Sequence, residues 1–350
     1  MKHEELKRYN RQIILSEIGL SRQEKLKSAQ VLMIGAGGLG CPILQYLAAA
    51  GVGKIGIVDD DVIGLSNLHR QILYSTADIG KSKAIVAKEK LKLLNPHINI
   101  TSYDERFTAD NAKIICESYD LVIDGSDNFE TRYLVNDICV ALKKVLVFGS
   151  IFKFEAHITV FNDRDGPNYR DVFPSVPSSD EAPSCAEVGV LGVLPGIVGA
   201  YMANEAIKII CGIGASLSGK LMIIDTLHNT THIFNVAKQK QNTFHNTGAT
   251  TTESIKTIHD EITTDELNAW LSTYPDELHL IDVRENHEFE YYNVGGINIP
   301  LHELNKHIGS LPENKKLIFC CQTWQRSKMA IQVLKPTYKG EMYHLKNGLT

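Results

Sequence analysis

The first half of the chain alternates short apolar runs with stretches of helical length. Residues 30–35 (QVLMIG) and 54–59 (KIGIVD) are apolar β-type runs, separated by a glycine-rich loop and an apolar helical stretch at 42–50. A strand, a helix and a second strand within about 30 residues form a βαβ unit with parallel strands and a right-handed crossover. The alternation continues with strands expected at 98–103, 119–124 and 144–149 and helices at 81–94 and 109–117. This pattern predicts a doubly wound, Rossmann-like α/β sheet.

After residue 150 the strands follow one another without intervening helices. The runs 156–162, 220–226 and 230–236 predict antiparallel strands that extend the sheet and make it mixed, and a helix is expected at about 195–211. Residues 163–186 are rich in Pro, Ser and Asp, which predicts a mobile loop.

A second α/β pattern follows a polar stretch. We expect a first domain at 1–237, a flexible linker at 238–256 and a second, smaller domain at 257–350. A linker of about 20 flexible residues has an r.m.s. span of roughly 25 Å. The second domain should contain a helix near 263–273, a strand at 278–283, and a strand at 316–321 that leads into a helix.

Composition narrows the class of protein. The chain has 350 residues, of which 43% are hydrophobic and 22% charged, and its net charge of −5 provides no basic field for nucleic acid or an anionic membrane. No apolar run approaches the roughly 20 residues of a membrane helix, and the polar start has no signal-peptide core. Seven cysteines, scattered except for Cys320-Cys321, suit free thiols in a reducing compartment, so that a cytoplasmic location is expected.

The glycine-rich loop predicts a nucleotide site. Its pattern is GxGGxG, with glycines at 35, 37, 38 and 40, and it places backbone amides at a helix N-terminus, where they face an anion. Asp59 follows Gly40 by 19 residues at a strand end, the usual place for an acidic residue that binds ribose. Taken by themselves, these features are also compatible with an NAD-dependent oxidoreductase.

Polar residues at other strand ends favour ATP with Mg²⁺ over NAD. In a doubly wound sheet the carboxyl ends of the strands line the ligand crevice. A triphosphate requires cations and a carboxylate for the metal, which hydride transfer does not. The candidates are Asp61, Asn67, Arg70, Gln71, Lys83, Asp127 and Asn128.

Four runs carry a family resemblance: RYNRQ (8–12), GAGGLGCP (35–42), LSNLHRQ (65–71) and DGSDNFETR (124–132). Over about residues 4–237 the chain resembles the MoeB/ThiF/HesA family, relatives of the ubiquitin-activating enzymes. The resemblance implies an adenylyltransferase that uses ATP to activate the C-terminal glycine of a ubiquitin-like sulfur carrier, of the MoaD or ThiS type, in molybdopterin or thiamine biosynthesis.

The resemblance also implies roles for single residues. Asp59 would bind ribose, Asp127 would hold Mg²⁺, Arg70 and Lys83 would bind phosphates, and Asn67 would position them. Arg11 would enter the site of a neighbouring subunit as an arginine finger, which implies a homodimer. Fixed cations stabilise the charge that spreads over the leaving pyrophosphate.

Members of the family differ in two features that involve cysteine residues: a reactive cysteine in a loop and a zinc site. Cys185 matches the family's loop cysteine, which in some members forms a covalent intermediate with the activated carrier and in others is dispensable. Many members bind zinc through two Cys-x-x-Cys pairs, but this chain has Asn168-Tyr169-Arg170-Asp171 at the first position and no such pair anywhere. We therefore expect no zinc site and a 163–186 loop less restrained than in zinc-bearing relatives.

Over about residues 257–350 the chain resembles the rhodanese family. The resemblance rests on IDVRE (281–285), GGINIP (295–300) and a loop in which Cys321 precedes Arg326 and Ser327. It implies that backbone amides at a helix N-terminus, closed by Arg326, stabilise a thiolate or persulfide on Cys321. A persulfide donor would load Cys321, and the sulfur would convert the activated carrier to a thiocarboxylate.

Alternatives to an active rhodanese-like domain stay open. Trp324 stands where the family usually has glycine, at a position expected to need a positive φ. Cys320 has the Cys-x5-Arg spacing of cysteine phosphatases, although adjacent strand residues point to opposite faces, which favours Cys321. An inactive docking module is thus a second hypothesis. The chain stops at Leu349-Thr350, short of the closing helix expected of such a domain, which indicates a truncated sequence.

Overall fold

A computed structural model describes residues 1–174, 189–238 and 261–349, apart from residues 302, 313, 323, 336 and 347. The chain divides into two compact units, which correspond in the described part to residues 1–238 and 261–349. The expected linker lies outside the described residues except for Lys238. No helix in the part of the chain that the structure describes is long and apolar enough to cross a membrane.

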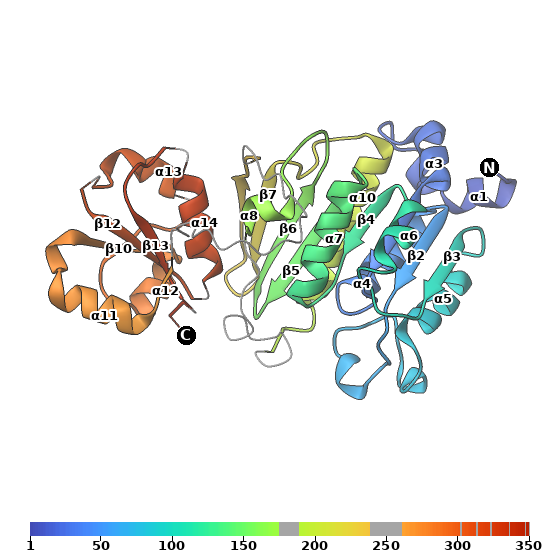
Figure 1. Ribbon diagram of the computed structural model, residues 1–350. Coiled ribbons are helices and arrows are strands. Elements are labelled where there is room, and N and C mark those ends of the chain that lie inside the picture. Colours follow the sequence, from blue (N-terminus) through green and yellow to red (C-terminus); the bar gives the residue numbers. More distant parts are fainter. Residues whose placement is uncertain are drawn as a thin grey trace. The chain divides into compact units, whose positions relative to one another are not determined.

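The first unit is built on a mixed sheet of eight strands, in the order β3-β2-β1-β4-β5-β6-β7-β8 (Figure 1). The first five strands along the chain are parallel, and β6, β7 and β8 join antiparallel, as the patterns predicted. The strands are β1 (Gln30–Ile34), β2 (Lys54–Val58), β3 (Asn99–Tyr103), β4 (Leu121–Asp124), β5 (Val145–Phe152), β6 (Glu155–Phe161), β7 (Lys220–Asp225) and β8 (Thr230–Asn235).

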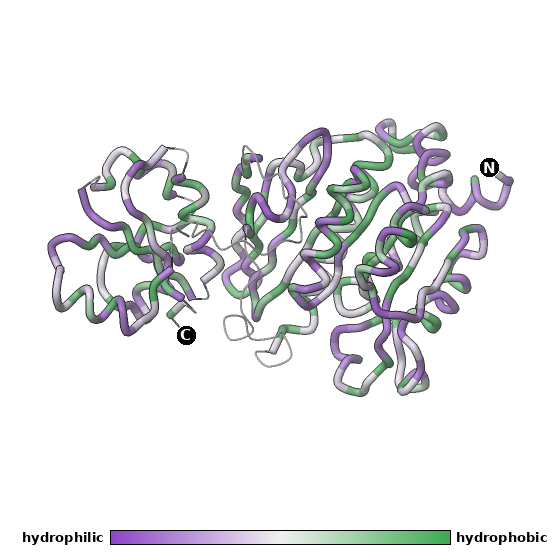
Figure 2. The backbone as a smooth tube through the Cα atoms, viewed as in Figure 1, coloured by the Kyte–Doolittle hydropathy of each residue, from purple (hydrophilic) through white to green (hydrophobic). Residues whose placement is uncertain are grey.

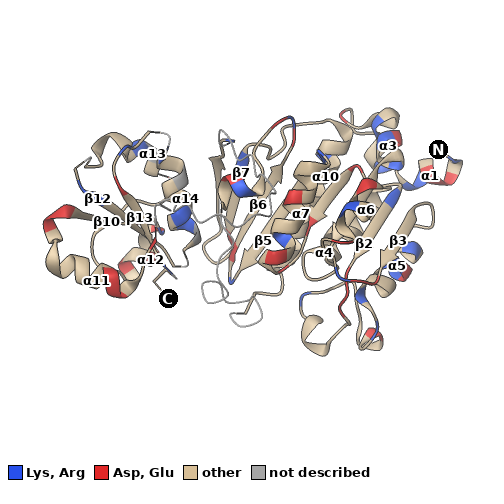
Figure 3. Cartoon of the chain, viewed as in Figure 1, with Lys and Arg blue, Asp and Glu red and all other residues tan. Residues whose placement is uncertain are grey.

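Helices cover both faces of this sheet (Figure 1). The helices are α1 (His3–Arg8), α2 (Asn10–Ile13), α3 (Gly19–Ser28), α4 (Gly40–Ala50), α5 (Lys83–Leu94), α6 (Ala112–Glu117), α7 (Phe129–Ala141), α8 (Tyr169–Val172) and α10 (Leu194–Cys211), with short 3₁₀ turns at Leu65–Asn67 and Thr76–Asp78. Apolar residues of α4, α5 and α10 form one core with the sheet, and hydrophobic positions follow the central strands and α10 in Figure 2. Helices α3 and α7 carry charges of both signs in Figure 3.

The stretch predicted as a mobile loop at 163–186 contains a short, anchored helix, so that this prediction is wrong for its described part. Tyr169 of α8 is buried, and the centroid of its ring lies 5.0 Å from that of Tyr133 and 4.9 Å from that of Phe173. Asn168 caps the helix by accepting a hydrogen bond from Arg170 N at 2.8 Å, and Arg170 forms a bidentate ion pair with Asp137. Residues 175–188 lie outside the described residues.

The second unit is a five-stranded parallel sheet in the order β11-β10-β12-β13-β9. Its strands are β9 (Glu261–Ile262), β10 (Leu278–Asp282), β11 (Ile297–Asn298), β12 (Lys316–Cys320) and β13 (Met342–Leu345). Its helices are α11 (Thr264–Thr273), α12 (Asn286–Tyr291), α13 (Leu304–His307) and α14 (Gln325–Leu334), with 3₁₀ turns at Pro275–Glu277 and Ile308–Ser310. Ile262, Leu267 and Ile318 belong to its hydrophobic core.

Glycine contacts fix the point where the strand order of the first sheet reverses, between β1 and β4. Gly35 has φ +89°, and a Cβ there would lie 2.9 Å from the carbonyl oxygen of Gly125, the residue after β4. A Cβ on Gly40, the first residue of α4, would lie only 2.1 Å from the carbonyl oxygen of Gly35. Strand β1 can therefore turn into α4 only with glycine at these positions.

We predict that Gly40→Ala lowers the free energy of unfolding by about 1–3 kcal/mol, because the added methyl group overpacks against backbone. Thermal or denaturant unfolding measures the change. Gly196→Ala in α10 is the matched control, since among the described residues an added Cβ there would meet no heavy atom within 4 Å outside the adjoining residues and its own helix backbone. A Gly40→Ala protein as stable as the wild type would contradict the prediction.

Candidate active site

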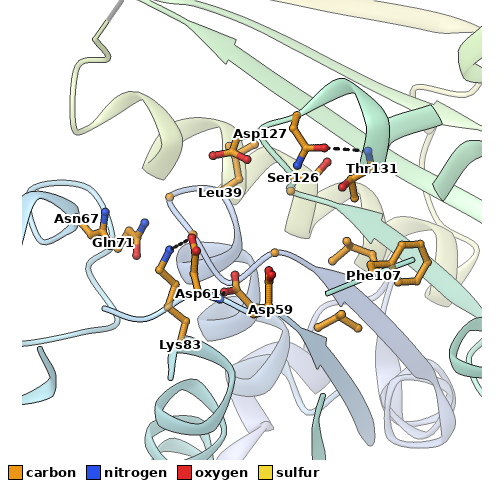
Figure 4. A pocket seen from close by; sticks show the side chains of 18 of the residues that line it. Leu39, Asp59, Asp61, Asn67, Gln71, Lys83, Phe107, Ser126, Asp127 and Thr131 are labelled. Atoms are coloured by element: carbon orange, nitrogen blue, oxygen red, sulfur yellow. Dashed lines mark hydrogen bonds and ion pairs between the residues drawn. The ribbon is translucent and has the colours of Figure 1, made fainter. Parts of the chain in front are cut away.

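The described residues enclose a pocket of about 410 Å³ at the carboxyl ends of the parallel strands. The glycine loop between β1 and α4 forms part of its wall, residues after β2, β3 and β4 form most of the rest, and Ile151 of β5 and Val190 also line it. In Figure 4, Asn67, Gln71 and Lys83 lie on one side of Asp61, whereas Ser126, Asp127 and Thr131 lie on the other. The strand order thus gathers at one edge the side chains that the sequence scatters over 100 residues.

Asp59 ties the end of β2 to the glycine loop. Its Oδ2 accepts a hydrogen bond from Ala36 N at 2.7 Å, and its Oδ1 accepts one from Asp61 N at 2.9 Å. Burial raises the pKa of this carboxyl group, while the two backbone amides and Lys83 act in the opposite direction. The carboxylate therefore has a fixed orientation at the pocket wall, as a residue that binds a sugar hydroxyl requires.

Cationic and amide groups occupy the side of the pocket that follows β2. Lys83 opens α5, and its buried Nζ lies 2.8 Å from Oδ2 of the exposed Asp61. Arg70 donates from Nη1 to Ser66 O at 3.1 Å. Gln71 is buried, and its Oε1 accepts no hydrogen bond from the described residues, which leaves it able to bind a ligand.

The opposite side of the pocket comes from the turn between β4 and α7. Asp127 is exposed on this turn, and Asn128 caps α7 by accepting a hydrogen bond from Thr131 N at 2.9 Å. Below it, the buried Arg132 donates from Nη2 to Ser126 O at 3.2 Å. Ser126 N in turn donates to Oδ1 of the buried Asp124 at 2.9 Å. These contacts hold the turn, and with it the Asp127 carboxylate, at the pocket.

Most of the residues expected from the sequence line this pocket. These are Gly35, Gly37, Gly38, Asp59, Asp61, Asn67, Arg70, Gln71, Lys83, Asp127 and Asn128. Gly40 lies behind the loop, at the start of α4. Arg11 is exposed and does not line the pocket of its own chain, and Cys185 lies outside the described residues.

Sequence reasoning missed several residues that line the pocket, among them Phe107, Ser126, Thr131 and Arg132. Phe107 is buried and follows β3, so the strand-end argument that selected Asp59 also applies to it. Ser126, Thr131 and Arg132 fall within the run DGSDNFETR, of which the sequence predicts only Asp127 and Asn128 as site residues.

A second cluster surrounds Cys321, directly after β12. The buried Cys321 Sγ accepts a hydrogen bond from Ser327 N at 3.2 Å and lies 3.4 Å from Ser327 Oγ. Ser327 belongs to the first turn of α14, so the sulfur lies at a helix N-terminus, which favours a thiolate or persulfide anion. Burial instead raises the pKa of the Cys320 thiol, whose Sγ lies 3.7 Å from Ile281 O.

The arginine and tryptophan of this loop depart from the expected pattern. The Arg326 guanidinium forms a bidentate ion pair with Glu288 of α12, at 2.7 and 2.8 Å. Trp324 has φ −3°, so the positive φ expected at this position is not present. The indole is buried, and Lys328 Nζ lies 5.1 Å from the centroid of the Trp324 ring. The larger side chain is accommodated because the residue adopts a different backbone conformation.

Both units of the chain match known protein families. Residues 9–245 match the ThiF family, and residues 263–350 match the rhodanese-like domain. The chain belongs to the ThiF family and carries a C-terminal rhodanese-like domain. This assignment favours an adenylyltransferase over the NAD-dependent oxidoreductase.

Curated relatives match between 64% and 100% of the chain. The chain is 52% identical over 229 residues to the sulfur carrier protein adenylyltransferase of Thermus thermophilus, which covers 64% of this chain and 84% of that protein. It is 39% identical to the probable adenylyltransferase/sulfurtransferase MoeZ of Mycobacterium tuberculosis, over 100% of this chain and 93% of the relative. The probable molybdopterin-synthase adenylyltransferase of Porphyra purpurea is 37% identical, over 99% and 92%.

Solved structures agree on the fold of the first unit. The crystal structure of E. coli MccB with ATP covers 66% of this chain and 72% of that chain, at 23% identity and a TM-score of 0.59. The crystal structure of PaaA covers 68% and 76%, at 24% identity and the same TM-score of 0.59. At these identities the likeness concerns the fold.

We predict that Cys321, and not Cys320, acquires sulfur when the protein is treated with a sulfane-sulfur donor. Ser327 N already donates to the Cys321 sulfur, whereas burial disfavours the Cys320 thiolate. Mass spectrometry of the intact protein should show one added sulfur atom in the wild type and in Cys320→Ser, but not in Cys321→Ser. The reverse pattern would select Cys320.

Proposed function

We propose that the first unit uses ATP to adenylate the C-terminal glycine of a ubiquitin-like sulfur-carrier protein, and that the rhodanese-like unit supplies the sulfur for a thiocarboxylate. The single observation that carries the first step is the pocket, which combines a glycine loop, an oriented Asp59, cations on one side and Asp127 on the other. The names of the relatives, sulfur carrier protein adenylyltransferase and adenylyltransferase/sulfurtransferase, support both steps.

The pocket residues divide between binding and charge stabilisation. Asp59 accepts a hydrogen bond from the ribose, and the base lies toward Phe107, the buried aromatic residue beyond Asp59 in Figure 4. The amides of the glycine loop contact the phosphates. A carboxylate oxygen of the carrier attacks the α-phosphorus, the bond to the β-phosphate breaks, and pyrophosphate leaves.

Arg70 and Lys83 stabilise the negative charge that develops on pyrophosphate, and Asn67 and Gln71 orient it. Lys83 can shift from Asp61 to a phosphate because that carboxylate is largely exposed and hydrates readily. Fixed cations in a pocket that excludes bulk water contribute more to such a transition state than mobile ions in solution.

Asp127 is the proposed ligand of Mg²⁺. Its exposed carboxylate lies at the pocket on a turn held from below by Arg132, and carboxylate oxygens are the ligands that Mg²⁺ prefers. When bound, the ion supplies charge neutralisation for the phosphates. The expected absence of zinc stays a prediction.

In the second step, Cys321 carries the sulfur. The Cys321 thiolate attacks a persulfide donor, and the terminal sulfur transfers as the donor thiolate leaves. The terminal sulfur then attacks the acyl carbon of the adenylated carrier, and AMP leaves. A second thiolate then attacks Cys321 Sγ of the resulting acyl disulfide, so that a disulfide with Cys321 forms and the thiocarboxylate leaves. Cys185 is our candidate for that thiolate.

A homodimer would complete the first site. Arg11 is exposed and away from its own pocket, and the segment around it carries the exposed apolar side chains of Leu6, Ile14, Leu15 and Leu20. A second copy of the chain that covers these side chains would bury apolar surface and receive Arg11 at its pocket.

A molybdopterin-type carrier is the first candidate substrate, because the Porphyra relative is named for molybdopterin synthase, and a thiamine-type carrier is the alternative. The cytoplasmic location that the cysteine pattern indicates stays a prediction.

We predict that the protein catalyses ATP–pyrophosphate exchange that depends on a carrier ending in Gly-Gly, and that Asp127→Ala lowers the exchange rate at least 100-fold, since removed charge stabilisation costs about 10²–10³ in rate. Exchange of labelled pyrophosphate into ATP measures this. Asp110→Ala is the control, because Asp110 is exposed and does not line the pocket. Tight ATP binding without exchange for any carrier would refute the proposed activity.

We predict that Cys321→Ala abolishes thiocarboxylate formation and leaves the exchange rate unchanged, because the two steps use different units of the chain. Mass spectrometry of the carrier detects the replacement of one carboxylate oxygen by sulfur. Thiocarboxylate formed at the wild-type rate by Cys321→Ala would exclude a catalytic rhodanese-like unit and favour the inactive docking module.

A further inference from the structure

The segment that carries Arg11 is bound to one end of helix α4. Tyr9 is buried, and its hydroxyl accepts a hydrogen bond from Asn95 Nδ2 at 2.8 Å. The same Nδ2 lies 2.6 Å from Ala48 O, to which it also donates. The Tyr9 ring packs on Gly51, where a Cβ would lie 2.6 Å from Tyr9 Cζ. A side chain at position 51 would therefore displace the tyrosine.

Gln12 forms a second attachment to the same helix end. Its Nε2 lies 2.6 Å from Gln23 Oε1 and 3.3 Å from Ala50 O. Gln23 is fully buried and donates from its own Nε2 to Ala50 O at 2.9 Å. The last carbonyl groups of a helix have no partner within the helix, and both amides donate to one of them, Ala50 O. The attachments of Tyr9 and Gln12 thus stand on either side of Arg11.

Arg11 is held at the wrong end of α4 to serve its own pocket. The glycine loop precedes Gly40 at the N-terminus of α4, whereas the attachments are at Ala48 and Ala50. A helix of 11 residues is about 16 Å long at 1.5 Å per residue. Arg11 projects into solvent from the short helix α2 and does not line the pocket.

We propose that Tyr9 and Gln12 are positioning residues that fix Arg11 for the pocket of a second copy of the chain. This inference rests on the proposed function. Because the backbone on both sides of Arg11 is already attached, the arginine is presented without ordering a mobile N-terminus, and the entropic cost of forming the transition state is smaller. Within RYNRQ, Arg11 acts on the substrate, and Tyr9 and Gln12 act through Arg11.

The test is a double-mutant cycle on carrier-dependent ATP–pyrophosphate exchange. We expect Gln12→Ala to lower kcat roughly tenfold without changing the Kd of ATP, since a misplaced group costs up to about 10²-fold. Tyr9→Phe, which retains the packing on Gly51, should give a smaller loss. In an Arg11→Ala protein, neither substitution should lower kcat further, because there is no arginine left to position.

Controls separate positioning from loss of fold. Tyr46→Phe, at an exposed tyrosine of α4, should leave kcat and thermal stability unchanged. Mixing Arg11→Ala subunits with Asp127→Ala subunits should restore part of the exchange, since one pocket of a mixed dimer then has both groups.

Three results would overturn the inference. If the Arg11→Ala protein exchanged pyrophosphate at the wild-type rate, this arginine would have no role in the reaction. The proposed adenylation would not be affected by that result. An equal loss from Gln12→Ala in the wild-type and Arg11→Ala proteins would show a structural role alone. Mixed subunits without recovered exchange would show that Arg11 does not act in a second copy. Exchange by the wild-type protein is established first, so that a failure of the proposed function is recognised separately.

Discussion

The close approach of backbone to backbone at the end of β1 is the constraint on which the rest of the first unit depends. A Cβ on Gly40 would lie 2.1 Å from the carbonyl oxygen of Gly35, so only glycine lets α4 begin at this point. Gly35 in the same way allows the turn to pass close to the backbone of Gly125. Because α4 starts so close to the sheet, the glycine loop that precedes it forms part of the pocket wall. The same placement carries the other end of α4 to the N-terminal segment, where Tyr9 and Gln12 attach.

In both units, three buried or part-buried cations lie against carboxylates. Lys83 lies against Asp61, Arg284 against Asp282 and Arg326 against Glu288. A buried charge without such a neighbour would lose its hydration without compensation. The pairs differ in how readily they can be exchanged for a substrate. Asp61 is mostly exposed and can release Lys83 to solvent-accessible phosphate, whereas Asp282 and Arg284 are both inaccessible and serve the fold of the second unit.

The central strands of the first sheet could be predicted because their amino-acid pattern fits a buried strand and no other element. Strands β1, β2 and β4 are apolar runs bounded by polar residues, and the observed bounds lie within two residues of the expected ones. Short strands such as β9 and β11 span two residues each, which is too short for any periodicity, and they form only because a neighbouring strand offers hydrogen bonds. Helix α7 was missed because its first turn was considered only as part of a ligand motif. At the site, strand ends located Asp59 and Asp127, but the Tyr9–Asn95 hydrogen bond joins residues 86 positions apart and has no local signal.

The contacts that hold helix α8 determine how this part of the protein responds to oxidation. It precedes the stretch that contains Cys185, and in the described residues it is held by an asparagine cap, an aromatic cluster and the Arg170–Asp137 ion pair. None of these groups is readily oxidised or exchanged for another ligand, as thiolates at a metal centre are. Oxidative stress would therefore leave this anchor intact while it modified the sulfur of Cys321, and a shortage of metal ions would remove none of the contacts of α8. The architecture around α8 and the reactivity at Cys321 thus depend on separate groups.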